Sequence, residues 1–215
     1  MRVFTGPPAT ILFLACAALA QPATFPSPLV DSKHAGSGSR TAVLAGGCFW
    51  CVEAVFEQLE GVEKAVAGFA GDDAGSANYE LVSAGRTKHA ESVEITYDPS
   101  RISYGTLLKV FFSVAHDPTQ LNRQGPDRGR QYRSAIFYSN PEQKRIAEAY
   151  IRQLTEAHVF RNPIVTEVTP LRKFYPAEER HQRYCRRHPE DPYVVANSQP
   201  KVEKLKKEDA NLLKK

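Results

Sequence analysis

The chain has 215 residues, with 28 lysine and arginine side chains against 24 aspartate and glutamate side chains, and its net charge is +4. That length suits one domain with additional segments at its ends. Residues 201–215 hold six lysines, two glutamates and one aspartate, and Arg2 supplies the remaining positive charge, so residues 21–200 are close to neutral. A neutral central region argues against a nucleic-acid-binding domain.

Residues 1–20 have the pattern of a secretory signal peptide. Arg2 precedes an apolar run over residues 9–18, and Ala18-Leu19-Ala20 resembles an A-x-A cleavage site. The run is too short for a comfortable membrane span. We therefore expect an exported protein, periplasmic or otherwise extracytoplasmic. Phe13-Leu14-Ala15-Cys16 loosely resembles a lipoprotein signal, which leaves a lipid-anchored form as an alternative.

Three further segments follow the signal. Residues 21–40 are rich in Pro, Ser, Gly and Ala, which is typical of a flexible linker. The catalytic domain is expected over residues 41–200. Residues 201–215 form a basic C-terminal tail, which we expect to be a solvated helix rather than a binding device.

The predicted elements begin with a short apolar strand over residues 41–45, followed by two glycines. Apolar residues at helical spacing then indicate a helix, namely Val52, Val55, Phe56 and Leu59. Gly61 is expected to end this helix as a C-cap.

The rest of the domain alternates irregularly between strands and helices. Strands are expected over residues 62–69, 92–97, 134–138 and 163–171, and helices over 103–115, 141–157 and 177–187. Ser103 and Asn140 are expected N-caps, with Pro141 at the first helical position. The polar loop 117–131 is long enough to suggest a functional role. This pattern predicts an α+β fold: a two-layer α/β sandwich with helices packed on a mixed, mostly antiparallel sheet and a ferredoxin-like core.

Cys48 and Cys51 are the leading candidates for chemistry. Cys48 lies where the first strand turns into the helix, and unpaired N–H groups at a helix N-terminus favour a thiolate. The Cys-x-x-Cys spacing fits a catalytic nucleophile, a thioredoxin-like disulfide exchanger or a structural zinc site. Zinc would need Cys185 and His188 as further ligands, which are more than 130 residues away.

The signal peptide contains Cys16, so its removal leaves Cys48, Cys51 and Cys185. An odd number of cysteines in an exported protein indicates a thiol that is not purely structural. Export also places these thiols in an oxidising compartment, where turnover requires a supply of electrons.

Phe49 and Trp50 lie between the two cysteines. Aromatic residues at a helix start usually pack in the core, but these two neighbour the candidate nucleophile. They are therefore candidates for an apolar cup that receives a thioether methyl group, because sulfur and methyl groups pack well on aromatic rings.

Glu91 is the candidate general acid. Its position in the alternating strand places it on the apolar face, with Val93, Ile95 and Tyr97. Burial among apolar groups raises the pKa of a carboxyl and keeps it protonated near neutral pH. The alternative is a glutamate at the strand end that reaches solvent.

Tyr79, Tyr132 and Asp127 lie in or beside polar loops. The tyrosine hydroxyls are candidates to hold a polar oxygen near Cys48, although buried tyrosines often only satisfy one hydrogen bond. Judged only from its place in the loop, Asp127 is expected to be a charged residue on the surface.

Taken together, these residues resemble the peptide methionine sulfoxide reductases of the A type. The resemblance runs from about Thr41 to Pro192. Its segments are Gly47-Cys48-Phe49-Trp50 with Val52-Glu53, His89-Ala90-Glu91, Tyr97-Asp98-Pro99, Ile102-Ser103-Tyr104, His116-Asp117-Pro118, Asn122-Arg123-Gln124-Gly125, Gln131-Tyr132-Arg133-Ser134-Ala135-Ile136 and Tyr175-Pro176-Ala177-Glu178.

The resemblance implies reduction of methionine S-sulfoxide, free or in proteins, and a role in the repair of oxidised proteins. It implies that Cys48 attacks the sulfur and becomes a sulfenic acid, which a second thiol converts to a disulfide. The resemblance also implies that Glu91 donates a proton to the sulfoxide oxygen and that Tyr79 and Tyr132 hydrogen-bond this oxygen. It implies that Phe49 and Trp50 enclose the methyl group. Asp127 is implied to help order the site.

No metal and no bound cofactor are implied. The implied partners are oxidised proteins or peptides that contain methionine sulfoxide, and a thioredoxin-type reductant that reopens the disulfide. We expect a monomer with no nucleic-acid partner.

The recycling thiol departs from the family pattern. Many relatives carry a cysteine after a Pro-Tyr pair near the C-terminus, whereas Pro192-Tyr193 is followed here by Val194. Cys185 lies upstream, at a position that matches no recycling cysteine of the family. This favours Cys51 as the resolving thiol, with Cys185 as the alternative.

Overall fold

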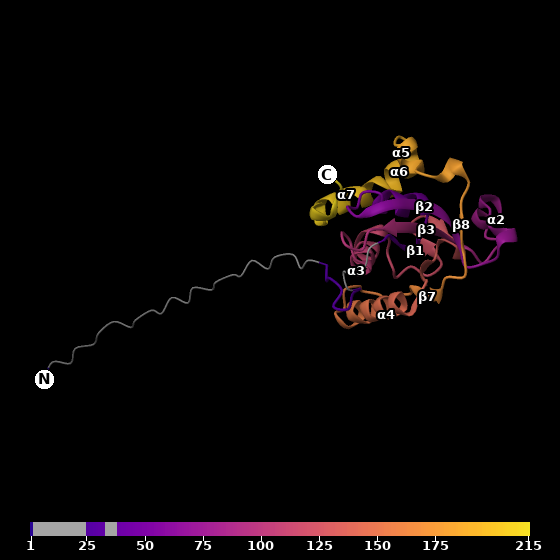
Figure 1. Ribbon diagram of the computed structural model, residues 1–215. Helices are drawn as coiled ribbons and strands as arrows, with labels where there is room; N and C mark the ends of the chain where they lie inside the picture. The colour runs from indigo at the N-terminus through magenta and orange to yellow at the C-terminus, as the bar shows by residue number, and fades with distance from the viewer. Residues whose placement is uncertain (2–24, 33–37) are drawn as a thin grey trace.

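The computed structural model describes residues 25–32 and 38–215, together with Met1. Its main sheet has the strand order β7-β6-β1-β3-β2-β8 (Figure 1). The strands are β1 (Arg40–Gly46), β2 (Val62–Ala70), β3 (Ala90–Tyr97), β6 (Ser134–Tyr138), β7 (Glu167–Pro170) and β8 (Phe174–Pro176). A separate hairpin is formed by β4 (Arg123–Gln124) and β5 (Asp127–Arg128).

The α-helices are α1 (Phe49–Phe56), α2 (Tyr79–Ser83), α3 (Tyr104–Val110), α4 (Pro141–Glu156), α5 (Tyr184–Arg187), α6 (Pro192–Asn197) and α7 (Gln199–Glu208). A π-helical turn, η2 (Phe111–Ala115), continues α3. Short 3-10 turns are η1 (Ala74–Ser76), η3 (Arg130–Tyr132), η4 (Glu179–His181) and η5 (Ala210–Leu212).

The inner strands have ferredoxin-like topology. The chain runs β1-α1-β2-β3-α3-β6, and these strands lie side by side as β6-β1-β3-β2 with every neighbouring pair antiparallel. At the edges, β7 pairs with β6 in parallel and β8 pairs with β2 antiparallel. The predicted α+β fold with a mixed, mostly antiparallel sheet is confirmed.

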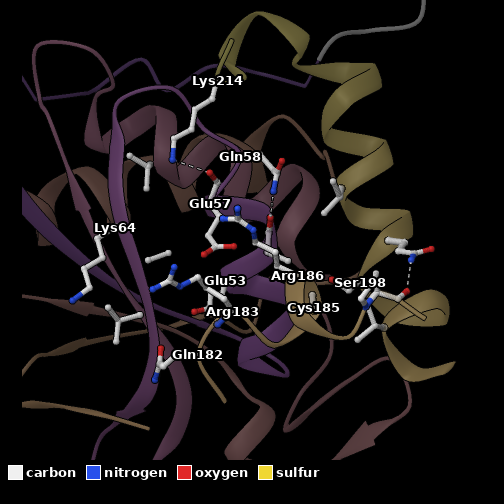
Figure 2. A pocket seen from close by; sticks show the side chains of 18 of the residues that line it. Glu53, Glu57, Gln58, Lys64, Gln182, Arg183, Cys185, Arg186, Ser198 and Lys214 are labelled. Carbon is white, nitrogen blue, oxygen red and sulfur yellow. Dashed lines mark hydrogen bonds between the residues drawn. The ribbon is translucent and has the colours of Figure 1, made fainter. Parts of the chain in front are cut away.

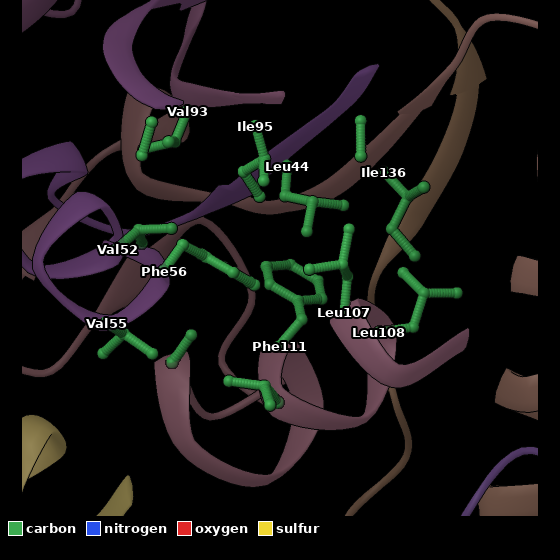
Figure 3. Packing of buried hydrophobic residues seen from close by; sticks show 14 of the residues in the cluster. Leu44, Val52, Val55, Phe56, Val93, Ile95, Leu107, Leu108, Phe111 and Ile136 are labelled. Carbon is green, nitrogen blue, oxygen red and sulfur yellow. The ribbon is translucent and has the colours of Figure 1, made fainter. Parts of the chain in front are cut away.

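The main core fills the space between one face of the sheet and the helices (Figure 3). From α1 it receives Val52, Val55 and Phe56, and from the α3 region Leu107, Leu108 and Phe111. These side chains pack on Leu44, Val93, Ile95 and Ile136 of the sheet, all fully buried. The apolar residues that recur at helical spacing in the sequence therefore face the sheet, as is expected for a helix with one buried face.

Two predicted helix starts are confirmed by their caps. The Ser103 hydroxyl accepts a hydrogen bond from the Thr106 amide at 3.0 Å. The Asn140 side chain accepts one from the Gln143 amide at 2.9 Å, with Pro141 in the first turn. Each cap satisfies an amide that the helix itself cannot pair.

Some predicted boundaries are wrong. The first helix ends at Phe56, and Gly61, with φ +83°, lies in the turn before β2 rather than at the C-cap. The strand predicted over 163–171 is shorter and forms β7. The helix predicted over 177–187 is divided into η4 and α5, because Arg183 between them adopts a left-handed backbone with φ +52°.

Residues 25–32, which fall in the segment expected to be a linker, contact the domain. The Tyr150 hydroxyl donates to the Pro26 carbonyl at 2.6 Å, and the Asp31 carboxyl accepts from the Gly105 amide at 2.7 Å. The predicted signal segment lies outside the described residues, apart from Met1. No helix in residues 25–32 and 38–215 has the length and apolar character needed to cross a membrane.

The C-terminal segment is also packed. The basic tail was expected to be solvated, but α7 lies against α1 and η2, and its Leu205 is fully buried. The Lys109 ammonium contacts the Asp209 carboxylate at 2.5 Å just beyond α7. Residues 199–209 are therefore part of the folded domain.

Candidate active site

Cys48 is placed by a tight turn between β1 and α1. Gly47 adopts φ +94°, and a Cβ there would lie 2.5 Å from the Gln124 side chain, so only glycine fits. The next residue, Cys48, is the N-cap of α1 and is 8% exposed. The predicted position of this thiol at the strand-to-helix junction is therefore confirmed.

Glu91 lies next to this turn, on the central strand β3. Its Oε2 accepts a hydrogen bond from the Phe49 amide at 3.0 Å, and the residue is 2% exposed. Burial raises the pKa of Glu91 to about 8, although the Phe49 hydrogen bond acts in the opposite direction. The carboxyl is thus protonated at neutral pH and available as a proton donor.

The expected thiolate at Cys48 is not the resting state. Burial raises the pKa of Cys48 well above its usual value, and the neighbouring Cys51 and Glu91 raise it further. The helix N-terminus does not compensate, because the short helix α1 offers its first amide to Glu91 instead. This raised pKa favours the thiol form of Cys48 at neutral pH.

Aromatic rings form one side of the site. Trp50 stacks on Tyr184 with a centroid distance of 3.8 Å, and Tyr79 stacks on His181 at 4.1 Å. Phe49 lies within 6.2 Å of both Trp50 and Tyr79, measured between ring centroids. Sequence reasoning found Phe49, Trp50 and Tyr79 but missed His181 and Tyr184, which belong to the segment predicted as one helix over 177–187 and divided in the structure into η4 and α5.

Tyr79 and Tyr132 are two further site residues, and both carry hydroxyl groups close to Glu91 and Cys48. Burial, with smaller effects of Glu91 and Cys48, raises the pKa of Tyr79 to about 12. Burial likewise raises the pKa of Tyr132, with Glu91, Asp127 and Cys48 acting in the same direction. Both phenols consequently stay protonated close to Glu91 and Cys48, where they can donate to an oxygen atom.

Asp127 is held by a residue that sequence reasoning did not assign to the site. Its Oδ2 accepts a hydrogen bond from the Tyr193 hydroxyl at 2.5 Å. Tyr193 also acts to lower the pKa of Cys48 and of Cys51, as a lesser influence beside burial and the neighbouring thiol. The only signal in the sequence was the Asp191-Pro192 pair, which starts α6 and thereby places Tyr193.

The three cysteines of the domain are free thiols in different environments. Cys51 lies one turn into α1, and its amide donates to the Cys48 carbonyl at 3.1 Å. The neighbouring Cys48 thiol lowers the pKa of Cys51, and burial acts against this effect. The Cys185 thiol instead donates to the Trp50 carbonyl at 3.3 Å, and burial raises its pKa to about 12.

The structure therefore brings Cys48, Cys51 and Glu91 together with the predicted substrate-binding residues Phe49, Trp50, Tyr79, Asp127 and Tyr132. The Cys185 thiol contacts the Trp50 carbonyl and lines the adjacent cavity. Within the residues that the structure describes, no three His, Cys, Asp or Glu side chains are grouped to hold a metal ion, so the zinc alternative has no ligand set there.

A cavity of about 1210 Å³ lies next to this site but does not include it (Figure 2). It is bounded by α1, β2 and the C-terminal segment, and Glu53, Glu57, Arg183 and Cys185 are among its lining residues. Glu53 is 1% exposed, and its Oε2 accepts from the Arg183 amide at 2.8 Å. Burial raises the pKa of Glu53 to about 7.

Comparison with known proteins shows the family of this chain. The sequence model of the family described as peptide methionine sulfoxide reductase matches residues 40–213. Peptide methionine sulfoxide reductase MsrA 2 of Synechocystis sp. is 52% identical over 192 residues, which cover 88% of this chain and 90% of that protein. The protein of the same name from Mesorhizobium japonicum is 56% identical over 177 residues, covering 82% of this chain and 90% of its own.

Solved structures are similar as well. Methionine sulfoxide reductase A of Corynebacterium diphtheriae is 35% identical with a TM-score of 0.62, covering 80% of this chain and 88% of its own. Reduced Mxr1 of Saccharomyces cerevisiae is 30% identical with a TM-score of 0.64, covering 74% of this chain and 90% of its own.

Proposed function

The chain belongs to the peptide methionine sulfoxide reductases of the A type, and we propose that it reduces methionine S-sulfoxide through a sulfenic acid on Cys48. The observation that carries this proposal is the buried Glu91 carboxyl, fixed by the Phe49 amide at the turn that holds Cys48. This arrangement places a proton donor beside a sulfur nucleophile in a buried site that excludes water.

The substrate enters with its methyl group against the rings of Phe49 and Trp50. An apolar methyl next to sulfur packs well on aromatic faces. The sulfoxide oxygen then accepts hydrogen bonds from Tyr79, Tyr132 and the protonated Glu91. This arrangement distinguishes the two sulfoxide epimers, because exchanging oxygen and methyl would place the polar atom against the rings.

Reduction begins when the Cys48 sulfur attacks the sulfoxide sulfur while Glu91 gives its proton to the oxygen. This attack forms a bond between the two sulfur atoms. The bonds from the methionine sulfur to the oxygen and to the Cys48 sulfur then break as the hydroxyl passes to the Cys48 sulfur, and methionine is released. The thiol proton of Cys48 restores the Glu91 carboxyl. The net exchange converts thiol and sulfoxide into sulfenic acid and thioether, with atoms and electrons balanced.

Cys51 then forms a disulfide with Cys48, and water leaves. Cys51 lies beside Cys48 in the first turn of α1, with its amide on the Cys48 carbonyl at 3.1 Å, whereas the Cys185 thiol donates to the Trp50 carbonyl; this supports Cys51 over Cys185. Side chains three residues apart on a helix must approach to disulfide range, so the first turn of α1 has to loosen. A thioredoxin-type dithiol reopens the disulfide by exchange.

The wider role is repair of oxidised proteins and peptides by a monomeric, exported enzyme. Export is supported by the signal pattern of residues 1–20. Mass spectrometry of the protein from fractionated cells tests this point, because a cleaved protein would begin at Gln21. Size-exclusion chromatography with light scattering tests the monomer.

The decisive experiment uses a blocked methionine sulfoxide with separated epimers and dithiothreitol as reductant. We expect the wild type to reduce the S epimer only, and Cys48→Ser to abolish turnover. The matched control is Cys185→Ser, which removes a thiol outside the site and should retain sulfoxide reduction. Turnover by Cys48→Ser would overturn the proposal.

A further inference from the structure

Helix α5 lies beside the active site but contributes no residue to the buried core. None of its residues, Tyr184 to Arg187, is buried. The Tyr184 ring nevertheless stacks on Trp50, with a centroid distance of 3.8 Å and an interplanar angle of 10°. Because burial of apolar surface contributes little here, the position of α5 depends on the polar contacts that precede it.

The chain just before α5 is tied to two other elements. The Gln182 side chain accepts from the Ala67 amide of β2 at 3.0 Å and donates to the Ala67 carbonyl at 2.9 Å. The Arg183 amide donates to Glu53 Oε2 of α1 at 2.8 Å (Figure 2). Arg183 has a left-handed backbone, which a residue other than glycine keeps only where its surroundings hold it. The bond to Glu53 is therefore part of what holds the turn that begins α5.

Glu53 is a carboxyl in a place where an apolar residue would be expected. It is 1% exposed, and its Oε1 has no hydrogen-bond partner within residues 25–32 and 38–215. A buried polar oxygen without a partner costs stability, so an apolar side chain would serve the core better. A hydrogen bond that the carboxyl makes, and that an apolar residue could not make, is the one from the Arg183 amide.

The orientation of Trp50 depends on stacking. Its indole Nε1 is buried and has no hydrogen-bond partner in the part of the chain that the structure describes. The centroid of Tyr184 lies 3.8 Å from that of Trp50, whereas His181 and Tyr193 are at 5.8 Å and 6.1 Å. Displacement of Tyr184 would therefore remove the ring that packs most closely on Trp50.

Resting on the proposed function, we propose that Glu53 is a positioning residue for the substrate pocket. It holds the turn at Arg183, this turn places Tyr184, and Tyr184 fixes the Trp50 ring on which the substrate methyl group packs. The methyl group meets this ring both before and during attack by Cys48. Loss of the contact therefore weakens substrate binding more than it slows the chemical step.

Single-turnover release of methionine from the blocked S-sulfoxide, without reductant and over a range of substrate concentrations, tests this role. For Glu53→Met we expect the concentration at half-maximal rate to rise about three- to tenfold, as loss of one aromatic contact would cause. The maximal rate should stay close to that of the wild type. Glu53→Gln keeps an oxygen that accepts from the Arg183 amide and should restore the wild-type concentration. A lower maximal rate at an unchanged half-maximal concentration would overturn the proposal.

The matched control is Glu57→Met. Glu57 is the C-cap of α1, one turn beyond Glu53, and lines the same cavity. This variant removes a carboxyl from the cavity but leaves the bond between Glu53 and the Arg183 amide in place. It should therefore bind substrate like the wild type. The same rise in Glu57→Met as in Glu53→Met would overturn the proposal, because charge in the cavity would then explain both.

A second pair of variants tests the turn without changing the buried carboxyl. Arg183 is exposed, so its replacement leaves the core intact. Arg183→Val opposes a left-handed backbone because valine is β-branched, whereas Arg183→Asn tolerates it, and both lose the guanidinium. We expect only Arg183→Val to raise the half-maximal concentration. Equal values in the two variants would overturn the proposal, whether or not Glu53→Met folds.

The same measurement separates this proposal from the function on which it rests. Failure of the wild type to release methionine from the S-sulfoxide would refute the proposed function. Release by the wild type with no difference among the Glu53 and Arg183 variants would refute only the positioning role.

Discussion

The Phe49 amide donates a hydrogen bond to Glu91 Oε2 over 3.0 Å, and this bond ties the first turn of α1 to strand β3. Both partners are almost fully buried. One residue before Phe49 lies Cys48, so the bond also fixes the distance between the nucleophile and its proton donor. The fold, rather than a flexible loop, sets this part of the site.

The first prediction concerns the proton donated by Glu91. Because a positioned acid contributes about 10²–10⁴-fold to a rate, Glu91→Ala should lower the single-turnover rate of methionine release by a factor in that range. Glu91→Gln should lose less, since an amide can still donate a hydrogen bond. The wild-type rate should fall above pH 8, where Glu91 loses its proton.

The control for this series is Glu94→Gln, which changes a half-buried carboxyl on the same strand outside the site. It should retain the wild-type rate and pH profile. Equal rates for the wild type and Glu91→Ala would remove the acid role from Glu91.

The second prediction concerns stability against pH. The pKa of Glu91 is raised to about 8 in the folded protein, so the folded state binds the proton more tightly than the unfolded chain. The resulting stabilisation is complete below the unfolded pKa of about 4.3 and is lost as the pH rises through 8. Each pH unit in that interval changes the free energy of unfolding by at most about 1.4 kcal/mol.

Urea unfolding of the reduced protein at pH 5 and pH 8 measures this effect. The wild type should lose more stability between the two pH values than Glu91→Gln, which has no proton to lose. Parallel losses in the two proteins would show that other groups carry the pH dependence.

The third prediction separates Cys51 from Cys185. After one equivalent of substrate without reductant, the wild type and Cys185→Ser should both lose the thiols of Cys48 and Cys51. Cys51→Ser should stop at the sulfenic acid, which dimedone labels on Cys48. An intramolecular disulfide in Cys51→Ser would instead identify Cys185 as the resolving thiol.

The fourth prediction concerns the edge strand β8, which pairs with β2. A Cβ on Gly68 would lie 2.3 Å from the Tyr175 carbonyl and 2.4 Å from the Phe174 ring, so Gly68→Ala must displace β8 from β2. We expect a loss of about 1–3 kcal/mol in the free energy of unfolding. Gly75→Ala is the control, because its nearest neighbouring atom would be 3.5 Å away. Equal stability of the two variants would contradict the predicted clash.

The sequence was sufficient for the parts of the site that depend on local pattern. The alternation of Val93, Ile95 and Tyr97 predicted that Glu91 is buried, and the glycines before Cys48 predicted its turn. These inferences succeed because strand parity and turn chemistry act over a few residues.

The remainder of the site depends on contacts between distant segments. Tyr184 reaches Trp50 because Arg183 takes a left-handed backbone and gives its amide to Glu53, 130 residues earlier in the chain. No local sequence pattern predicts a hydrogen bond between residues so far apart in the chain. The raised pKa of Cys48 was missed for a related reason, because the burial that raises it comes from packing by distant segments rather than from the local helix pattern.

The stacking of Trp50 on Tyr184 also means that the intrinsic fluorescence of the protein reports on the active site. Trp50 is the single tryptophan of the chain, so all indole fluorescence originates beside the two active-site thiols. Substrate entry, oxidation of Cys48 and closure of the disulfide each change the surroundings of that one ring. Stopped-flow emission can therefore follow successive states of the catalytic cycle without an introduced label.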